Sequence, residues 1–383
     1  MRRGTIRAWY LVHKWTSLVC TLSLLVLCLS GLPLIFRAEI DAAMGRGGQL
    51  PPVAEGTVAP TLDRIVAGVL AGRPGEVVQS VSFEEDRPVA DIVTAPRLDT
   101  PYDDAHLHYI DLRSGRPVAG PPKDTGFLWA MEELHIRLFL GQNGTYFVGV
   151  MGLVFLVALV SGVVVYMPFM RKLDYGTVRL GRSARLKWLD LHNVIGVSAT
   201  AWLAVVGVTG VFNTLDVPLA NQFRTGQLAE MQAPYAHAPP LKRLGSLDAA
   251  VATARRASPG MEPATIAYPG TFFGTPHHYN IFMRGASPVT ERLLKPTLVD
   301  AETAELTDTR DMDLHIRALF LSRPLHYGDY GGLFLKLVWA GFDLMAIAVL
   351  LSGLYLWLGR WRAPVEKRLD ELESGAAVEE AAQ

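Results

Sequence analysis

Four long stretches without charged side chains constrain this 383-residue chain more than any other feature. Residues 15–36, 141–170 and 191–215 contain no Lys, Arg, Asp or Glu, and residues 337–358 contain only Asp343. A helix needs about 20 apolar residues to cross the hydrocarbon core of a bilayer. We therefore expect an α-helical integral membrane protein with four transmembrane helices, at residues 15–36, 145–170, 191–215 and 333–358.

Basic side chains are concentrated in three short stretches that flank these helices. They are Arg2, Arg3, Arg7 and Lys14; Arg171, Lys172, Arg179, Arg182, Arg185 and Lys187; and Arg360, Arg362, Lys367 and Arg368. Because Lys and Arg are enriched in cytoplasmic loops, we expect a cytoplasmic N-terminus at 1–14, a cytoplasmic loop at 171–190 and a cytoplasmic tail at 359–383. The long stretches 37–140 and 216–332 would then face the periplasm of a bacterium, from its inner membrane.

The first helix is interpreted as an uncleaved signal anchor, since its apolar run exceeds the about 7–15 residues of a typical signal-peptide core. Each long stretch outside the membrane has the pattern of an α+β domain, with apolar residues at helical spacing followed by alternating, strand-like segments. The expected helices are at 60–71 and 246–256, the expected strands at 77–83, 89–93, 264–268 and 279–284, and the expected hairpins at 109–118 and 298–306.

The two halves of the chain share two spacings between histidine and glycine. The first spacing is 18 residues and the second is 27 residues in both halves; the residues are His13 and Gly31, His192 and Gly210, His135 and Gly162, and His326 and Gly353. Such matched spacings indicate an internal duplication. We therefore expect two pseudo-symmetric halves, each with a periplasmic domain, and sites between them.

Histidine in or near a membrane span is costly and marks a functional site. With the orientation above, His13 and His192 lie at cytoplasmic helix ends, and His135 and His326 lie on the periplasmic side. Neutral imidazole is an axial ligand of haem iron, and helix bundles build cofactor sites from facing side chains. The pattern predicts two b-type haems, one on each pair of histidines.

His315 is an alternative to His326. The segments 133–137 and 313–317 are similar around their histidines, but the 27-residue spacing to Gly353 favours His326. That spacing is about 40 Å in one helix, and the glycine-rich segments 141–144 and 328–332 indicate a helix break instead.

The glycines are expected to give a porphyrin room to pack. Eighteen residues are five helical turns, so Gly31 and Gly210 would lie beside the periplasmic haem, and Gly162 and Gly353 beside the cytoplasmic one. The alternative interpretation is that the histidines are interfacial or relay protons and that the glycines only allow close helix packing. Asp343 is either a proton relay or a structural partner of a neighbouring helix.

Several motifs resemble the PepSY-associated transmembrane family over about residues 5–362. They are the segments 11–15, 191–192, 324–328 and 352–357, and both hairpins resemble the end of a PepSY domain. The likeness is closest to the FoxB-type members, inner-membrane reductases of ferric siderophores such as ferrioxamine. The resemblance implies b-type haems on His13, His192, His135 and His326, and electron flow from the cytoplasmic side to the periplasm.

This resemblance suggests an oxidoreductase that reduces a ferric siderophore and releases Fe(II), because hard oxygen ligands hold Fe(II) less well than Fe(III). The partners would be the siderophore, membrane lipids, and an electron donor that is either quinol or a cytoplasmic-side reductant. We expect no flavin or nicotinamide domain within the chain itself, although the donor could be a flavin reductase or reduced flavin. No nucleic-acid partner is expected, and no catalytic residues beyond the haem ligands. The alternatives are a dihaem cytochrome b between quinol and a periplasmic partner, or a non-redox PepSY module that binds peptides or restrains a protease.

Overall fold

The computed structural model describes residues 3–45, 50–168, 175–179, 181, 183–287 and 290–359. Part of the predicted loop 171–190, and the predicted tail 359–383 except Gly359, lie outside these residues. The chain divides into two compact units. The helical unit comprises Met1–Arg37, Ala130–Thr214 and Ser322–Gln383, and the sheet unit comprises Ala38–Trp129 and Leu215–Leu321.

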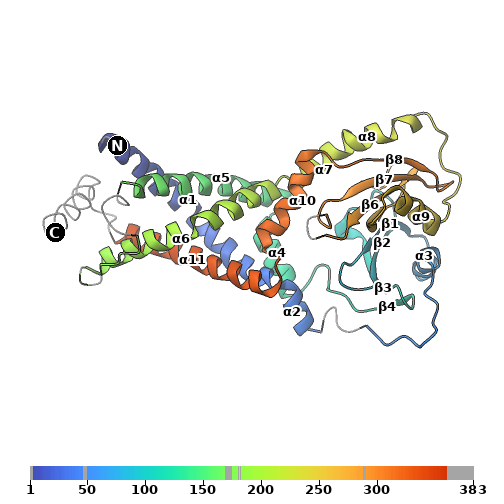
Figure 1. Ribbon diagram of the computed structural model, residues 1–383, viewed down its shortest axis with the longest axis horizontal. Helices are drawn as coiled ribbons and strands as arrows, with labels where there is room; N and C mark the ends of the chain where they lie inside the picture. Colours follow the sequence, from blue (N-terminus) through green and yellow to red (C-terminus); the bar gives the residue numbers. More distant parts are fainter. Residues whose placement is uncertain are drawn as a thin grey trace. The chain divides into compact units, whose positions relative to one another are not determined.

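Four long helices run side by side in the helical unit (Figure 1). They are α1 (Arg3–Ile35), α5 (Gly141–Tyr166), α6 (Ala184–Asn213) and α11 (Gly332–Leu358). Each is long and apolar enough to cross a membrane, which confirms the predicted transmembrane character within the described residues. Helix α1 packs against α5 and α11, and α6 packs against the same two helices. The four helices therefore form a closed bundle with two opposite ends.

Short helices precede two of the spans, as the predicted helix breaks require. Helix α4 (Phe127–Arg137) comes before α5, and helix α10 (Leu314–Tyr327) comes before α11. The chain turns through positive φ at Leu138 and Phe139 (50° and 57°) in the first break, and at Gly328 (73°) in the second. Glycine adopts this conformation without strain, whereas leucine and phenylalanine do not.

The strands of the sheet unit form one antiparallel sheet in the order β4-β3-β2-β1-β5-β6-β7-β8. Their bounds are β1 (Val77–Phe83), β2 (Val89–Ala95), β3 (His106–Asp111), β4 (Arg116–Pro117), β5 (Met261–Ala267), β6 (His278–Gly285), β7 (Lys295–Asp300) and β8 (Leu306–Thr309). The expected strands and hairpins are thus present. The two domains expected from the sequence, however, share a single sheet.

The pairing of β1 with β5 joins the two long stretches. Val81 lies opposite Ile266, and the hydroxyls of Ser82 and Thr265 are 3.0 Å apart across the same pair of strands. Each strand alone would leave a row of unpaired backbone groups at a sheet edge. Joining the two edges satisfies those groups, which is the physical reason that one sheet forms. Alternation of apolar and polar residues predicts that a segment forms a strand, but it does not predict which strand will pair with it.

Helices α3 (Leu62–Ala71) and α9 (Leu247–Ala257) pack on one face of this sheet around a buried core that includes Val81, Ile92 and Ile281. The helices α7 (Asp216–Thr225) and α8 (Gln227–Gln232) contribute to a second core with Phe282 and Leu298. A further short helix, α2 (Arg37–Ala43), follows α1. Successive side chains along a strand point alternately to the two cores, which explains the alternating pattern of residues in the sequence.

Helices α3 and α9 cap each other through two aspartates. The carboxylate of Asp63 accepts hydrogen bonds from Ser246 Oγ (2.5 Å) and from the backbone N–H of Leu247 (2.7 Å). The carboxylate of Asp248 accepts from the backbone N–H groups of Leu62 and Asp63, both at 2.9 Å. Each aspartate therefore satisfies the first N–H groups of the other helix, where a negative charge is also favourable.

Candidate functional site

His13 and His192 face each other at one end of the helical unit. Their ring centroids are 6.5 Å apart, with 63° between the ring planes. His13 comes from α1, and its Nδ1 lies 2.8 Å from the carbonyl oxygen of Ala158 on α5. His192 comes from α6, and its Nδ1 lies 3.1 Å from the carbonyl oxygen of Val349 and 2.9 Å from Ser352 Oγ, both on α11.

His135 and His326 form the second pair, on the two short helices α4 and α10. Their ring centroids are 6.2 Å apart, with 59° between the planes. His135 Nδ1 lies 2.9 Å from the carbonyl oxygen of Leu27 on α1. His326 Nδ1 lies 3.1 Å from the carbonyl oxygen of Val206 on α6. The structure thus brings together the same pairs that the sequence spacing predicted.

Three of the four histidines also contact a hydroxyl that precedes a glycine. Ser30 Oγ is 3.3 Å from His135 Nδ1, Thr209 Oγ1 is 3.2 Å from His326 Nδ1, and Ser352 is described above. The sequence contained a signal for these contacts, because Ser or Thr stands directly before each of the four glycines. The matched His–Gly spacings did not involve these residues, and their contact with histidine was not predicted.

These contacts fix which ring nitrogen remains for a ligand. A backbone carbonyl only accepts hydrogen bonds, so each Nδ1 donates its proton to the carbonyl it faces. The neutral imidazole then carries its lone pair on Nε2. Metal-binding histidines commonly use this arrangement, in which a carbonyl orients the ring and fixes its tautomer. In all four histidines, these contacts therefore leave Nε2 as the ring nitrogen with the lone pair.

The four glycines make room for the imidazoles. A Cβ atom added at Gly31 would lie 2.8 Å from His135 Cε1, and one at Gly162 would lie 2.9 Å from His13 Cε1. The corresponding distances are 3.0 Å from Gly210 to His326 and 3.4 Å from Gly353 to His192. The glycines therefore lie beside the predicted pairs, and a histidine ring lies close to the backbone of each of them.

Outside the long spans, burial keeps the second pair neutral. Desolvation between the helices lowers the pKa of His135, and it lowers the pKa of His326 to about 4, helped by the neighbouring His135. Hydrogen bonds from the rings to Leu27 and Val206 oppose this shift only in part. Burial therefore favours the neutral imidazole at physiological pH, which is the form that metal binding requires.

The spacing of the pairs fits a six-coordinate haem iron. Imidazole nitrogen binds a metal at about 2 Å, and the nitrogen lies about 1 Å from its ring centre, so two opposed ligands have centroids about 6 Å apart. The observed 6.5 Å and 6.2 Å match this value. Over the described ranges, no group of three or more His, Cys, Asp or Glu side chains could hold a metal ion. Haem needs only two axial ligands from the protein, and the residues present fit it.

His315 is not part of the second pair. It occupies the first turn of α10, eleven residues before His326, and belongs to the sheet unit. Its Nε2 is buried and has no hydrogen-bond partner among the described residues. The ring that faces His135 is that of His326. This geometry favours His326 over His315 as the partner of His135.

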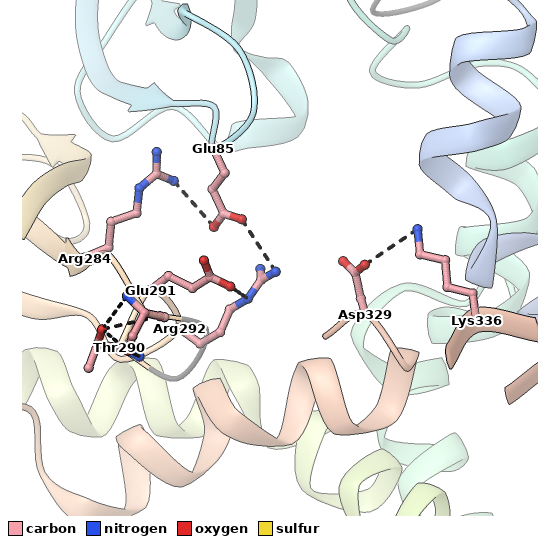
Figure 2. Close-up of polar contacts among 8 residues, drawn as sticks. Glu85, Arg284, Thr290, Glu291, Arg292, Asp329 and Lys336 are labelled. Carbon is pink, nitrogen blue, oxygen red and sulfur yellow. Dashed lines mark hydrogen bonds and ion pairs between the residues drawn. The ribbon is translucent and has the colours of Figure 1, made fainter. Parts of the chain in front are cut away.

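The sheet unit has a small charged cavity of about 230 Å³. Glu85, Glu262, Arg284 and Glu291 contribute to its lining. Figure 2 shows Glu85 between two guanidinium groups, 3.5 Å from Arg284 and 3.5 Å from Arg292. Binding pockets for drug-sized molecules usually measure roughly 300–1,000 Å³, and the opposite charges here pair with each other. The cavity is therefore a weak candidate for a substrate site.

The fold and site define a helical membrane protein that carries two facing histidine pairs. The chain belongs to the PepSY-associated TM region family, whose model matches residues 10–360. It is also similar to an uncharacterized protein of Pseudomonas aeruginosa, with 26% identity over 259 residues. This alignment covers 63% of the present chain and 65% of the relative, so it spans less than two thirds of that protein's length.

Proposed function

We propose that this protein is a dihaem reductase of the bacterial inner membrane that delivers single electrons to a ferric siderophore in the periplasm. The observation that supports this proposal is the presence of two facing histidine pairs at opposite ends of one helical bundle. His13 and the Gly31 that contacts His135 are 18 residues apart on α1, or about 27 Å along the helix axis. That distance is close to the thickness of the hydrocarbon core of a membrane.

The proposed haem ligands are His13 with His192, and His135 with His326. When bound, haem would supply one-electron chemistry, with a potential tuned by the axial ligands and their hydrogen bonds. The chain's own residues supply the rest of the site. One backbone carbonyl from each of the four long helices orients an imidazole ring. The adjacent glycines allow the rings to approach the helix backbone. Apolar helix surfaces exclude water around each pair.

The proposed direction rests on the distribution of charge. The basic residues of the N-terminus and of the loop 171–190 favour a cytoplasmic location for the end that holds His13 and His192. The sheet unit, which connects to the other ends of the helices, would then lie in the periplasm. A duplication of two halves, each with one four-stranded part of the sheet, explains the matched His–Gly spacings. The electron donor is quinol or another reductant on the cytoplasmic side.

The proposed acceptor follows from the FoxB-type resemblance and from coordination chemistry. A hydroxamate siderophore such as ferrioxamine holds Fe(III) with hard oxygen ligands. One added electron produces Fe(II), which such ligands bind far less tightly. The iron is released while the chelator stays intact, so the protein needs no acid–base residues for this reaction. Reduction would take place near His135 and His326, at the proposed periplasmic ends of the helices.

The test uses the purified full-length chain, reduced with dithionite under anaerobic conditions and freed of excess reductant. Mixed with a ferric hydroxamate siderophore, the wild-type protein should reoxidise and release Fe(II) that ferrozine traps. His315→Ala serves as the matched control and should behave like the wild type. His326→Ala should release no Fe(II), because it lacks one proposed ligand on the periplasmic side. A reduced protein that ignores ferric hydroxamates but is reoxidised by a quinone would support a quinol-linked cytochrome b instead.

A further inference from the structure

A buried carboxyl group that belongs to neither histidine pair lies inside the helical unit. Asp343 is 7% exposed and lies in the middle of α11. Its side chain shares a hydrogen bond with Cys28 of α1, and its Oδ2 atom has no hydrogen-bond partner among the described residues. An ionisable residue inside a membrane span is costly and calls for a functional explanation.

The surroundings of Asp343 contain two further polar atoms without described partners. Trp339 precedes Asp343 by about one turn of α11, and its ring centroid is 6.5 Å from that of Trp202 on α6. The indole Nε1 atoms of both tryptophans are buried, and neither has a hydrogen-bond partner within the described part of the chain. Buried polar atoms normally have partners, so this gathering within an apolar bundle needs a reason.

Asp343 lies at the level of the His135–His326 pair. Its partner Cys28 directly follows Leu27, whose carbonyl oxygen holds His135. Cys28 is 15 residues from His13, or about 22 Å along α1. On the other side, the ring of Trp339 packs against Gly328, two residues after His326. A charge change at the second pair therefore acts on Asp343 through apolar protein, where screening is weak.

Few other charged or titratable groups compete with Asp343. Of the two helices that pack against α11, α1 offers the thiol of Cys28, and α6 has no Asp, Glu, Lys or Arg between residues 191 and 213. The other charged residue of α11 is Lys336, seven residues earlier, which lies 3.6 Å from Asp329 (Figure 2). Within α11 and the helices α1 and α6, Asp343 is thus the acid inside the bundle at the level of the second pair. Glu132 of α4 also acts electrostatically on His135, but its carboxylate forms an ion pair with Arg37 at 2.7 Å.

We propose that Asp343 takes up a proton when an electron arrives at the His135–His326 site and releases it when the electron leaves. This inference rests on the proposed function. A one-electron donor supplies the electron, and the aqueous phase supplies the proton, which forms an O–H bond with one carboxylate oxygen of Asp343. The negative charge of the electron and the positive charge of the proton then cancel. When the acceptor removes the electron, the O–H bond breaks and the proton returns to water.

The test is a spectroscopic redox titration of the full-length protein at a series of pH values, for the wild type and for Asp343→Asn. In the wild type, the midpoint potential of the haem at the second pair should fall as pH rises. In the variant that potential should be independent of pH over the same range. Because asparagine stays neutral, the variant should equal the wild type at low pH and have the higher potential at high pH. The haem on His13 and His192 serves as the internal control.

A second readout does not depend on the variant. The redox-difference infrared spectrum of the wild type should contain a protonated-carboxyl band that appears on reduction. If Asp343→Asn fails to fold, Asp343→Glu should keep both this band and the pH dependence, with both shifted. A pH-independent potential in the wild type, or an unchanged dependence in Asp343→Asn, would overturn the inference alone. A wild-type protein without haem would instead overturn the proposed function.

Discussion

The imidazole rings of His135 and His326 face each other with centroids 6.2 Å apart, although neither residue belongs to one of the four long helices. Each ring donates its Nδ1–H to a carbonyl of a different long helix, at Leu27 of α1 and at Val206 of α6. The spacing of the pair therefore depends on the hydrogen bonds that hold His135 to α1 and His326 to α6. A small shift of either ring relative to its long helix should therefore change the distance between the two rings.

The glycine contacts provide a graded test of this dependence. Alanine at Gly31 would place Cβ 2.8 Å from His135 Cε1, so the ring must move, whereas alanine at Gly353 would place it at 3.4 Å from His192, an ordinary contact. Gly31→Ala should reduce haem at the second pair, and Gly31→Leu should abolish it, with the first pair spared. Gly353→Ala should keep nearly wild-type haem content. Haem content and the redox titration measure both effects, and equal losses in the two alanine variants would contradict the geometry.

The exchanged caps of Asp63 and Asp248 predict a loss of stability in the sheet unit. Asp63→Ala removes the acceptor for Ser246 Oγ and for the N–H of Leu247, and the loss of a helix cap costs about 1 kcal/mol. Hydrogen exchange of the first turn of α9 should become faster. Asp86→Ala, at an exposed acid in the same unit, is the control and should change little. Unchanged exchange in Asp63→Ala would show that the cap contributes nothing.

The same cap predicts that the stability of the first turn of α9 depends on pH. Burial by itself raises the pKa of Asp63, but hydrogen bonds from Ser246 and Leu247 outweigh it and hold the pKa below its usual value. Such a carboxylate contributes stability that is present above its unfolded pKa of about 3.9 and is lost as pH falls through the folded pKa. The amides of the first turn of α9 should therefore lose protection below about pH 4. Asp63→Asn should weaken this dependence; an identical pH profile would contradict it.

Asp91 on β2 predicts a dependence of stability on pH with the opposite sign. Burial, together with the nearby Glu84, raises the pKa of Asp91 to about 6, although Arg87 opposes the shift. Stability contributed by such a group is present at low pH and declines as pH rises from about 4 to the folded pKa. Because the side chain is partly exposed, Asp91→Asn should stabilise the protein by only about 1 kcal/mol above pH 6. Thermal unfolding across pH measures this, and a variant less stable at pH 8 would refute it.

Much of the helical part follows from the sequence alone. The uncharged runs gave the spans, because a bilayer requires long apolar helices, and the 18- and 27-residue spacings indicated which histidines would meet. The helices extend beyond the predicted spans, since α1 begins at Arg3 and α6 at Ala184, in segments whose basic residues are compatible with helix outside the apolar core.

The remaining features depend on contacts between distant residues. Nothing in the alternation of Val77–Phe83 or Met261–Ala267 indicates that these two strands pair with each other, so two domains were expected where one sheet forms. Likewise, a glycine on a helix indicates close approach but does not identify what approaches. At Gly31 the ring of His135 makes this approach, which the spacing alone did not indicate. The carbonyl of Leu27 carries no sequence signal, because every residue has one.

The central claim, that each facing histidine pair holds one haem, is tested most directly by haem stoichiometry. A pyridine-haemochrome assay should find two b-type haems per wild-type chain. His13→Ala, His192→Ala, His135→Ala and His326→Ala should each retain about half of that haem, since one axial ligand of one site is lost, and His315→Ala should retain all of it. Full haem content in all four variants, or a colourless and fully folded wild-type protein, would contradict the account.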